Sequence, residues 1–351
     1  MVHRYSHRDL TTCTAALFER AGLAPKIAHV VAEVLIEADL MGYDTHGLQF
    51  VPAYLLAIED GRTTRSGDPE ILRDEGAALV IDGRFLPGQW VARYALDKAL
   101  ERIADHPTVT VSICRSQNIS CLATYAKRAA DRGVMAILAA SAPGNAVVTP
   151  HGGREPRLST NPLAMGIPTN TTPILIDTST ASVTNRYVER TRRAGIRLPE
   201  PWLVDCEGKL SDDPEALYTE PPGAILPAGG EFQGHKGFAL SILVEVLTSG
   251  LTGAGRSTPE LAGGNHVFLQ LLDPEAFGGG TAFKRETGFL ADYCRDTTPI
   301  NPDHPVRMPG DRAHAQMAEQ RANGMTLQPE ILDRMTPWLD KYGLAAPTPL
   351  S

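Results

Sequence analysis

The chain has 351 residues, of which 42% are hydrophobic and 21% charged, and its formal net charge is −8. This composition is typical of a folded globular protein with room for two domains, and it excludes a disordered chain. The negative balance provides no basic field for nucleic acid or an anionic membrane, so we expect neither as a partner.

The N-terminal residues and the cysteines favour a cytoplasmic protein. Residues 1–13 contain no apolar segment long enough for a secretory signal. The most apolar run, residues 238–247, is too short to cross a bilayer and contains Glu245. The five cysteines are scattered without a CxxC pair, which argues against a disulfide framework and a zinc site. We therefore expect reduced thiols and no bound metal.

Helical and strand patterns alternate along most of the chain. An amphipathic helix is predicted to end near Gly42, and an apolar run over 50–61 leads into a polar linker. Further helices are predicted at 90–104, 123–133 and, as a buried helix, 238–249. Strands are predicted at 77–83, 109–114, 134–141, 174–177 and 266–272. The alternation indicates an α/β domain with a covered sheet that is at least partly parallel or mixed.

The glycine patterns disfavour two common nucleotide-binding folds. There is no GxGxxG between a strand and a helix, and no GxxxxGK[ST] anywhere in the chain. The glycine clusters at 250–256 and 277–281 lack the required context. A standard Rossmann or P-loop protein is therefore not expected.

The stretch DTHGLQF, residues 44–50, places His46 just after the first amphipathic helix, where a side chain can face a cleft. Imidazole, with a reference pKa near ~6.5, exchanges a proton at neutral pH. A single histidine at a helix end is more often only a polar residue. The choice between these interpretations therefore depends on the rest of the chain.

Several stretches, in the same order, resemble the malate/L-lactate dehydrogenase-like oxidoreductases. EADLMGYDTHG (37–47) is similar to that family's EAD-x-x-G-x-[DS]-[ST]-H-G signature. Further similar stretches lie at 81–92, 149–169, 174–181, 195–214, 226–240, 250–254 and 307–312. The resemblance spans roughly residues 30 to 315 and implies an NAD(P)-dependent homodimeric enzyme on a non-Rossmann α/β fold.

In such a fold, a mixed sheet belongs to the cofactor domain, and both chain ends build a helical domain. We accordingly expect a helical part over 1–62 that carries His46. A cofactor- and substrate-binding α/β domain then covers 63–304. A helical part over 305–351 is expected to pack back on the first.

The resemblance also implies roles for individual residues. His46 matches the proton donor, Thr45 assists it, and Phe50, Thr160 and Asn161 match positions near the substrate. The expected cofactor contacts are Asn118, Ile119, Ser120, Asp177, Thr178, Ser179, His235, Lys236, Gly237, Gly310, Asp311 and Arg312. Lys236 is predicted at a helix N-terminus, which suits a phosphate. The alternatives are ordinary ones: capping or turn hydroxyls, a solvated lysine and a loop turn.

Three positions depart from the family pattern. Phe50 stands where many relatives carry an arginine that pairs with the substrate carboxylate. Residues 116–120 read SQNIS rather than S-N-H-[FY]-G, and 185–187 read NRY where a glycine and a polar relay residue are common. A cluster of arginines either replaces the lost charge, meets a 2′-phosphate or forms a solvated face. Its members are Arg186, Arg190, Arg192 and Arg193.

Together these patterns favour an NAD(P)H-dependent reductase of a 2-oxo acid, a cyclic imine or a related carbonyl compound, with His46 as proton donor. A second interpretation is reduction of a substrate without a free carboxylate, with Phe50 lining an apolar pocket. A third is a relative that binds a cofactor or ligand without turnover. The intact Asp44–Gly47 motif argues against the third interpretation, and the three departures argue for it.

Overall fold

The computed structural model describes residues 3–350 of the chain. Its strands are β1 (Arg4–Tyr5), β2 (Glu70–Asp74), β3 (Ala78–Asp82), β4 (Thr108–Ser116), β5 (Met135–Ser141), β6 (Leu163–Ile167), β7 (Ile174–Thr178), β8 (Leu203–Val204), β9 (Leu210–Ser211), β10 (Ala224–Ile225), β11 (Asn265–Leu272) and β12 (Met325–Thr326). Its α-helices are α1 (His7–Arg20), α2 (Pro25–Leu40), α3 (Val51–Glu59), α4 (Gly88–Arg102), α5 (Leu122–Ala130), α6 (Asn185–Arg193), α7 (Gly230–Glu245), α8 (Gly280–Arg295), α9 (Asp311–Asn323) and α10 (Pro329–Tyr342). Short 3-10 turns are η1 (Leu48–Phe50), η2 (Pro214–Tyr218), η4 (Pro259–Leu261) and η5 (Pro274–Ala276), and η3 (Val246–Gly250) is a π-helical turn.

Seven strands of the described part form one mixed sheet in the order β2-β3-β4-β11-β5-β6-β7. β3 and β4 are parallel, whereas the other neighbouring pairs are antiparallel. At the centre, Leu269 of β11 pairs with Val111 of β4 and with Leu138 of β5. All three side chains are buried. The expected α/β fold with a mixed sheet is confirmed, with a stronger antiparallel character than the alternation of elements suggested.

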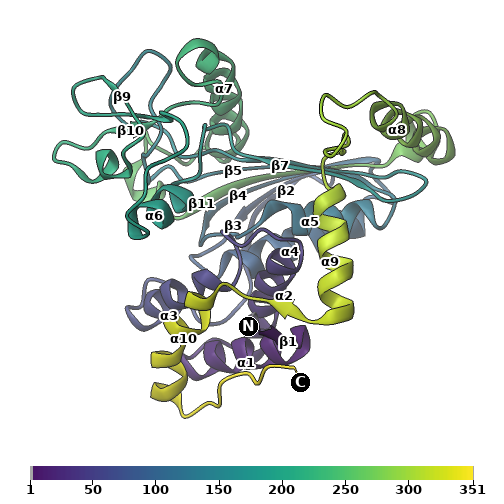
Figure 1. The fold of residues 1–351 in the computed structure, drawn as a ribbon. Coiled ribbons are helices and arrows are strands. Elements are labelled where there is room, and N and C mark those ends of the chain that lie inside the picture. Colours follow the sequence, from purple (N-terminus) through teal and green to yellow (C-terminus); the bar gives the residue numbers. More distant parts are fainter. Residues whose placement is uncertain (1–2, 351) are drawn as a thin grey trace.

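Helices α4 and α5 lie under one face of the sheet, α2 packs beneath them, and α1, α3 and α10 lie further from the sheet (Figure 1). α2 begins at Pro25, whose fixed φ suits a first helical turn. It ends before Gly42, whose φ of +79° is left-handed. The close approach of α5 to β6 depends on Gly166, because a Cβ there would lie 2.1 Å from the carbonyl oxygen of Ala126. The missing side chain of Gly166 thus allows α5 to contact the sheet directly.

The C-terminal helices return to the N-terminal ones (Figure 1). α9 contacts α2, α10 contacts α1 and α3, and β12 pairs with β1. The side-chain amide of Gln320 on α9 donates hydrogen bonds to the carbonyl oxygens of Asp39 and Leu40, at 3.0 and 3.1 Å. Those carbonyls lie at the end of α2, where helical partners run out. These contacts support the division at residues 62 and 305, which we retain as a proposal.

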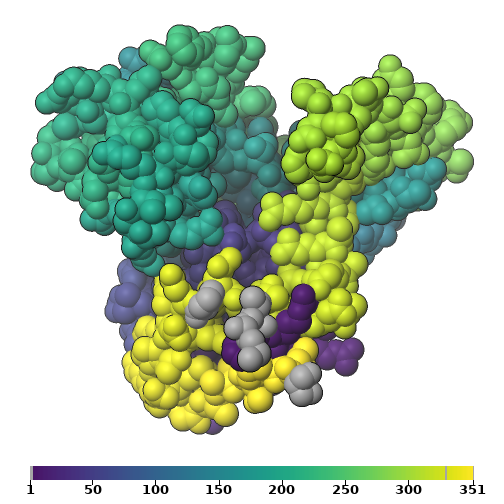
Figure 2. Space-filling view, in the orientation of Figure 1, coloured from purple at the N-terminus to yellow at the C-terminus, as the bar shows by residue number. Residues whose placement is uncertain are grey.

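The opposite face of the sheet is only partly covered. α7 and α8 stand over different parts of this face, and Figure 2 shows the molecule hollowed between the teal-green and yellow-green lobes to which they belong. The prediction of a buried helix over 238–249 is wrong in this respect, since Leu240, Leu243 and Val246 are 47%, 47% and 56% exposed. The segment is apolar on both sides, but the sheet covers only the side with Val244 and Leu247. Within residues 3–350, no helix has the length and apolar character needed to span a membrane.

Candidate active site

A cavity of about 430 Å³ opens beside the loop that follows α2, within the size range of small-molecule sites. The loop after β4, the ends of β5 and β7 and the start of α6 contribute to its wall. Ten residues that the sequence singled out meet there. They are Thr45, His46, Phe50, Asn118, Ile119, Ser120, Thr160, Asp177, Thr178 and Ser179.

The loop that carries His46 is held by the buried carboxyl group of Asp39, on the last turn of α2. Asp39 Oδ2 accepts a hydrogen bond from the Leu48 N–H at 2.8 Å. A Cβ at position 47 would lie 1.9 Å from Asp39 Oδ1, so only glycine leaves room for this carboxyl group. Burial raises the pKa of Asp39 to about 8, against the lowering effect of the Leu48 hydrogen bond. The spacing between Asp39 and Gly47 in the motif therefore has a steric reason.

His46 is fixed on both its ring and its backbone. Thr45 Oγ1 lies 2.9 Å from His46 Nδ1, and the hydroxyl of Ser120 donates a hydrogen bond to the His46 carbonyl oxygen. Burial, with a smaller effect from the charge of Arg186, lowers the pKa of His46 to about 4, and Asp44 opposes both effects. His46 is therefore neutral at pH 7 in the free protein. Thr45 contacts Nδ1 and makes no hydrogen bond to Nε2.

Asn118 and Ser120 form the next part of the wall, in the loop between β4 and α5. Asn118 Oδ1 accepts hydrogen bonds from the Tyr54 hydroxyl at 2.7 Å and from the Ser120 N–H at 2.9 Å. Ser120 has a φ of +65°, which is unusual for a residue other than glycine. Such strained residues are held in place by their surroundings and concentrate at functional sites. Here the strain directs the Ser120 side chain toward the His46 loop.

Asp177, at the end of β7, faces the N-terminus of α5. Its Oδ2 atom accepts a hydrogen bond from the Ala123 N–H at 2.9 Å and lies 3.4 Å from the Cys121 sulfur. A carboxylate at this point satisfies a helix N–H that has no helical partner. Burial nevertheless raises the pKa of Asp177 to about 6. Asp177 thus joins the end of β7 to α5 and also forms part of the cavity wall.

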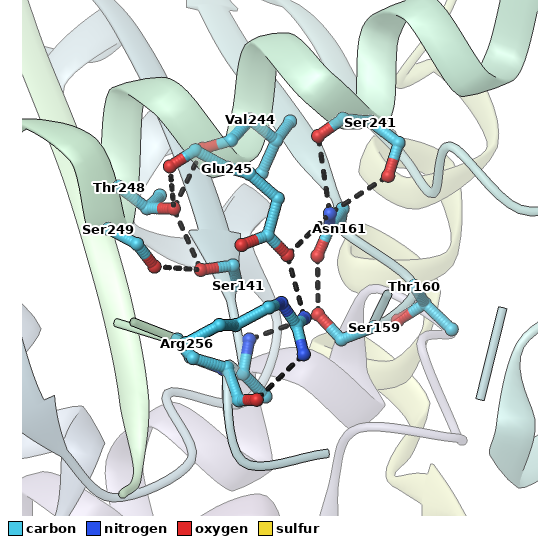
Figure 3. A network of polar contacts seen from close by, with 12 residues as sticks. Ser141, Ser159, Thr160, Asn161, Ser241, Val244, Glu245, Thr248, Ser249 and Arg256 are labelled. Carbon is cyan, nitrogen blue, oxygen red and sulfur yellow. Dashed lines mark hydrogen bonds and ion pairs between the residues drawn. The ribbon is translucent and has the colours of Figure 1, made fainter. Parts of the chain in front are cut away.

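Asn161 was predicted to contact the substrate, but its side chain points into a buried polar network beside the cavity (Figure 3). Asn161 Nδ2 donates hydrogen bonds to Ser241 Oγ at 2.8 Å and to Glu245 Oε1 at 3.1 Å. Arg256 pairs with the same Glu245 at 2.9 Å. The φ of Asn161, +43°, places its two neighbours on the cavity side. Its observed position is that of a residue that shapes the wall rather than one that lines it.

His235, Lys236 and Gly237 lie outside this cavity. Lys236 was predicted to lie at a helix N-terminus. This prediction is wrong, because α7 already begins at Gly230. The left-handed φ of Gly229, +97°, precedes that start. His235 and Lys236 are exposed, whereas Gly237 is buried against Ala228. The glycines thus start the helix more than one turn earlier than the predicted phosphate site requires.

Gly310, Asp311 and Arg312 also lie outside the cavity, at the start of α9. The carboxylate of Asp311 accepts a hydrogen bond from the Met308 N–H and pairs with Arg295 at 2.7 Å. These contacts lower its pKa. Arg312 lines a second cavity of about 640 Å³ beside α9 and α10. In the single chain, this segment closes the turn into α9.

The structure also brings residues to the cavity that were not predicted as site residues. Ser141 lies at the end of β5, and Asn145 and Ser159 lie in the loop between β5 and β6. Asn265 lies at the start of β11. Strand ends followed by polar residues are a usable signal for such positions. Arg186, the second residue of α6, reaches the cavity as well. In the sequence it could not be distinguished from the other arginines of its cluster.

The cavity suits the ribose and amide groups of a nicotinamide nucleotide. The cavity is lined by hydroxyl and amide hydrogen-bonding groups from Ser120, Thr178, Ser179, Asn118 and Asn145. Ile119 adds an apolar contact. Among the described residues, 3–350, no three His, Cys, Asp or Glu side chains are grouped so as to hold a metal ion. The hydroxyl, amide and apolar groups of the cavity wall match an organic cofactor.

The chain matches the malate/L-lactate dehydrogenase family over residues 5–336. An L-lactate dehydrogenase of Cupriavidus necator is 30% identical to it over 329 residues, which cover 92% of this chain and 93% of that protein. A (2R)-3-sulfolactate dehydrogenase (NADP(+)) of Chromohalobacter salexigens is 29% identical over 346 residues, covering 95% and 98% of the two chains.

Two solved structures have the same fold. A malate dehydrogenase from Entamoeba histolytica gives a TM-score of 0.92 at 24% identity, covering 99% of this chain and 100% of that one. A delta1-piperideine-2-carboxylate reductase from Pseudomonas syringae pvar. tomato gives 0.84 at 27% identity, covering 95% and 99%. The chain therefore belongs to the malate/L-lactate dehydrogenase family and is an NAD(P)-dependent oxidoreductase of small molecules.

Proposed function

We propose that the enzyme reduces the carbonyl group of a small 2-oxo acid, or the C=N group of a cyclic imino acid, with His46 as the proton donor. The observation that carries this proposal is the pairing of His46 with Thr45 in the wall of the cavity, which leaves Nε2 for the substrate. Two similar proteins are named an L-lactate dehydrogenase and a delta1-piperideine-2-carboxylate reductase. Their names support both kinds of substrate.

The reaction adds a hydride to carbon and a proton to the attached oxygen or nitrogen. Bound NAD(P)H supplies the hydride. Because the pKa of His46 is lowered to about 4, its protonated form is a stronger acid than an ordinary imidazolium and gives its proton readily to the developing alkoxide oxygen or amine nitrogen. The neutral form accepts a proton in the reverse reaction. Thr45 and Ser120 hold the imidazole and its backbone in place during both.

We further propose that two copies associate through the open face of the sheet. Apolar side chains that are exposed in the single chain gather on α7, η3 and α8: Phe232, Leu240, Leu243, Val246, Phe289, Leu290 and Tyr293. Ile137 and Met165, on neighbouring strands, turn toward the same face, because Gly166 and Ala164 face α5. Apolar surface of this extent is unusual on a monomer, and two-fold dimers are the commonest oligomers.

Fluorescence titration with NADH and NADPH, followed by assays with pyruvate, oxaloacetate and a cyclic imino acid, tests the catalytic proposal. His46→Ala should lower kcat by roughly 10²–10⁴-fold, the scale of a general acid or base. Cofactor affinity should change little. His29→Ala is the control, because His29 is an exposed histidine of α2 paired with Glu33. Near-normal turnover by His46→Ala would show that His46 is not the proton donor.

A further inference from the structure

The four arginines of α6 differ in where their guanidinium groups lie, with Arg186 in its first turn and the other three in its last turn. All four form ion pairs with carboxylates: Arg186 and Arg193 with Glu189, Arg190 with Asp44, and Arg192 with Glu215. Arg186 is the only Lys or Arg among the cavity-lining residues in the described part of the chain. The cavity therefore receives one permanent positive charge, and it comes from α6.

Phe50 holds this guanidinium group beside the catalytic histidine. The Cζ atom of Arg186 lies 4.6 Å from the centroid of the Phe50 ring. The rings of Phe50 and His46 are 6.0 Å apart, centroid to centroid. An aromatic face attracts a guanidinium group and orients its plane. Phe50 itself stacks on Tyr54 at 5.3 Å and is 6% exposed, so it is a rigid support.

The remaining contacts of Arg186 leave donors available. The Oγ1 atom of Thr184 accepts the Tyr187 N–H at 3.2 Å and begins the helix there, so Arg186 lies in its first turn. Arg186 Nη1 donates a hydrogen bond to Glu189 Oε2 at 2.6 Å. A guanidinium group has five N–H donors, and a carboxylate ligand needs two of them.

We propose that Arg186 binds the carboxylate of the substrate, replacing the arginine that relatives carry at the position of Phe50. Phe50 then supports the guanidinium group rather than lining a pocket for an uncharged substrate. This inference rests on the proposed function and narrows it to substrates with an anionic group next to the reacting carbon.

The electrostatics of the free protein agree with this assignment. Arg186 is the charged neighbour that lowers the pKa of His46, while Asp44 acts in the opposite direction. A carboxylate bound to Arg186 would offset its positive charge and raise the pKa of His46. Substrate binding would thus favour the protonated histidine that reduction requires.

The test uses Arg186→Gln and Arg186→Lys, with Arg192→Gln as the control on the exposed side of the same helix. Calorimetry measures the binding of oxamate, an unreactive analogue of pyruvate, to the protein saturated with NADH or NADPH. Steady-state assays compare pyruvate with its uncharged methyl ester. Thermal unfolding of each variant verifies that it is folded.

Arg186→Gln should weaken oxamate binding and lower kcat/KM for pyruvate on the order of 10²–10³-fold, as expected for a lost charge pair. The methyl ester and the cofactor affinity should change by less than about tenfold. The oxamate affinity and the kcat/KM for pyruvate of Arg186→Lys should lie between those of the wild type and Arg186→Gln, because lysine keeps the charge but lacks the planar guanidinium group. Arg192→Gln should behave as wild type.

Unchanged oxamate binding by Arg186→Gln would overturn the assignment, whatever the turnover. If oxamate binding depends on Arg186 while His46→Ala remains active, His46 is not the proton donor, but the assignment of Arg186 as the carboxylate-binding residue holds. Phe50→Arg provides an independent check, because it places a second guanidinium group beside Arg186. A gain of about tenfold or more in kcat/KM for pyruvate would show that the carboxylate was unpaired in the wild type and would also overturn the assignment.

Discussion

Gly47→Ala should destabilise the protein strongly, because the added side chain would meet a buried carboxyl group. The φ of Gly47 is −102° and therefore lies outside the left-handed region. An added Cβ would lie 1.9 Å from Oδ1 and 2.1 Å from Cγ of Asp39. That carboxyl group is 6% exposed and cannot move away without releasing the Leu48 N–H, which it binds at 2.8 Å.

Two costs add in this variant. Overpacking a buried site costs about 1–3 kcal/mol, and a buried N–H without a partner costs a further ~1–3 kcal/mol. The free energy of unfolding should therefore fall by roughly 2–6 kcal/mol. Asp39→Ala removes the obstructing carboxyl and leaves only the second cost. The double variant should then be about as stable as Asp39→Ala alone, so the two single effects should not add.

Denaturant unfolding of the wild type, both single variants and the double variant measures this coupling. Gly278→Ala is the control, since its Cβ would meet no atom within 4 Å and its φ is not left-handed. It should change the stability by no more than about 0.5 kcal/mol. If Gly47→Ala is as stable as this control, or if the double variant shows the sum of the single effects, the steric account of the motif is wrong. Turnover should fall with stability in Gly47→Ala, because His46 is the adjacent residue.

The remaining predictions concern pH and association. Initial rates should show kcat/KM for reduction falling about tenfold per pH unit above about pH 5, because a His46 pKa of about 4 makes the protonated form rarer as the pH rises. The oxidative kcat/KM should stay flat over the same range, since His46 is already neutral, and a flat reductive profile between about pH 5 and 7 would contradict the assignment. Light scattering should give twice the 37.8 kDa mass of the chain, and Leu243→Glu should yield monomers because Leu243 is 47% exposed on the open face. A monomeric wild type would exclude the proposed dimer.

The sequence by itself determined the elements whose signals are local. The apolar spacing of 31–38 and Gly42 predict a helix that ends near Gly42, and the observed α2 ends there. The central strands, such as β4 and β5, carry continuous apolar patterns that a buried strand needs. The ordered motifs around His46 indicated the family, because their spacing reflects contacts such as that between Asp39 and Gly47, close in the chain.

Only the tertiary structure decided which distant side chains meet. The sequence does not distinguish the four arginines of the 186–193 segment. The direction of α6 brings Arg186 over Phe50 and into the cavity wall, whereas Arg190, Arg192 and Arg193 do not line the cavity. Asn161 is next to a cavity residue in sequence, yet its left-handed backbone turns its amide into the buried network of Glu245. The apolar sides of α7 are equivalent in composition, and only the position of the sheet makes one of them core and leaves the other exposed. In each case the outcome depends on the packing of segments far apart in the chain, for which a local pattern holds no information.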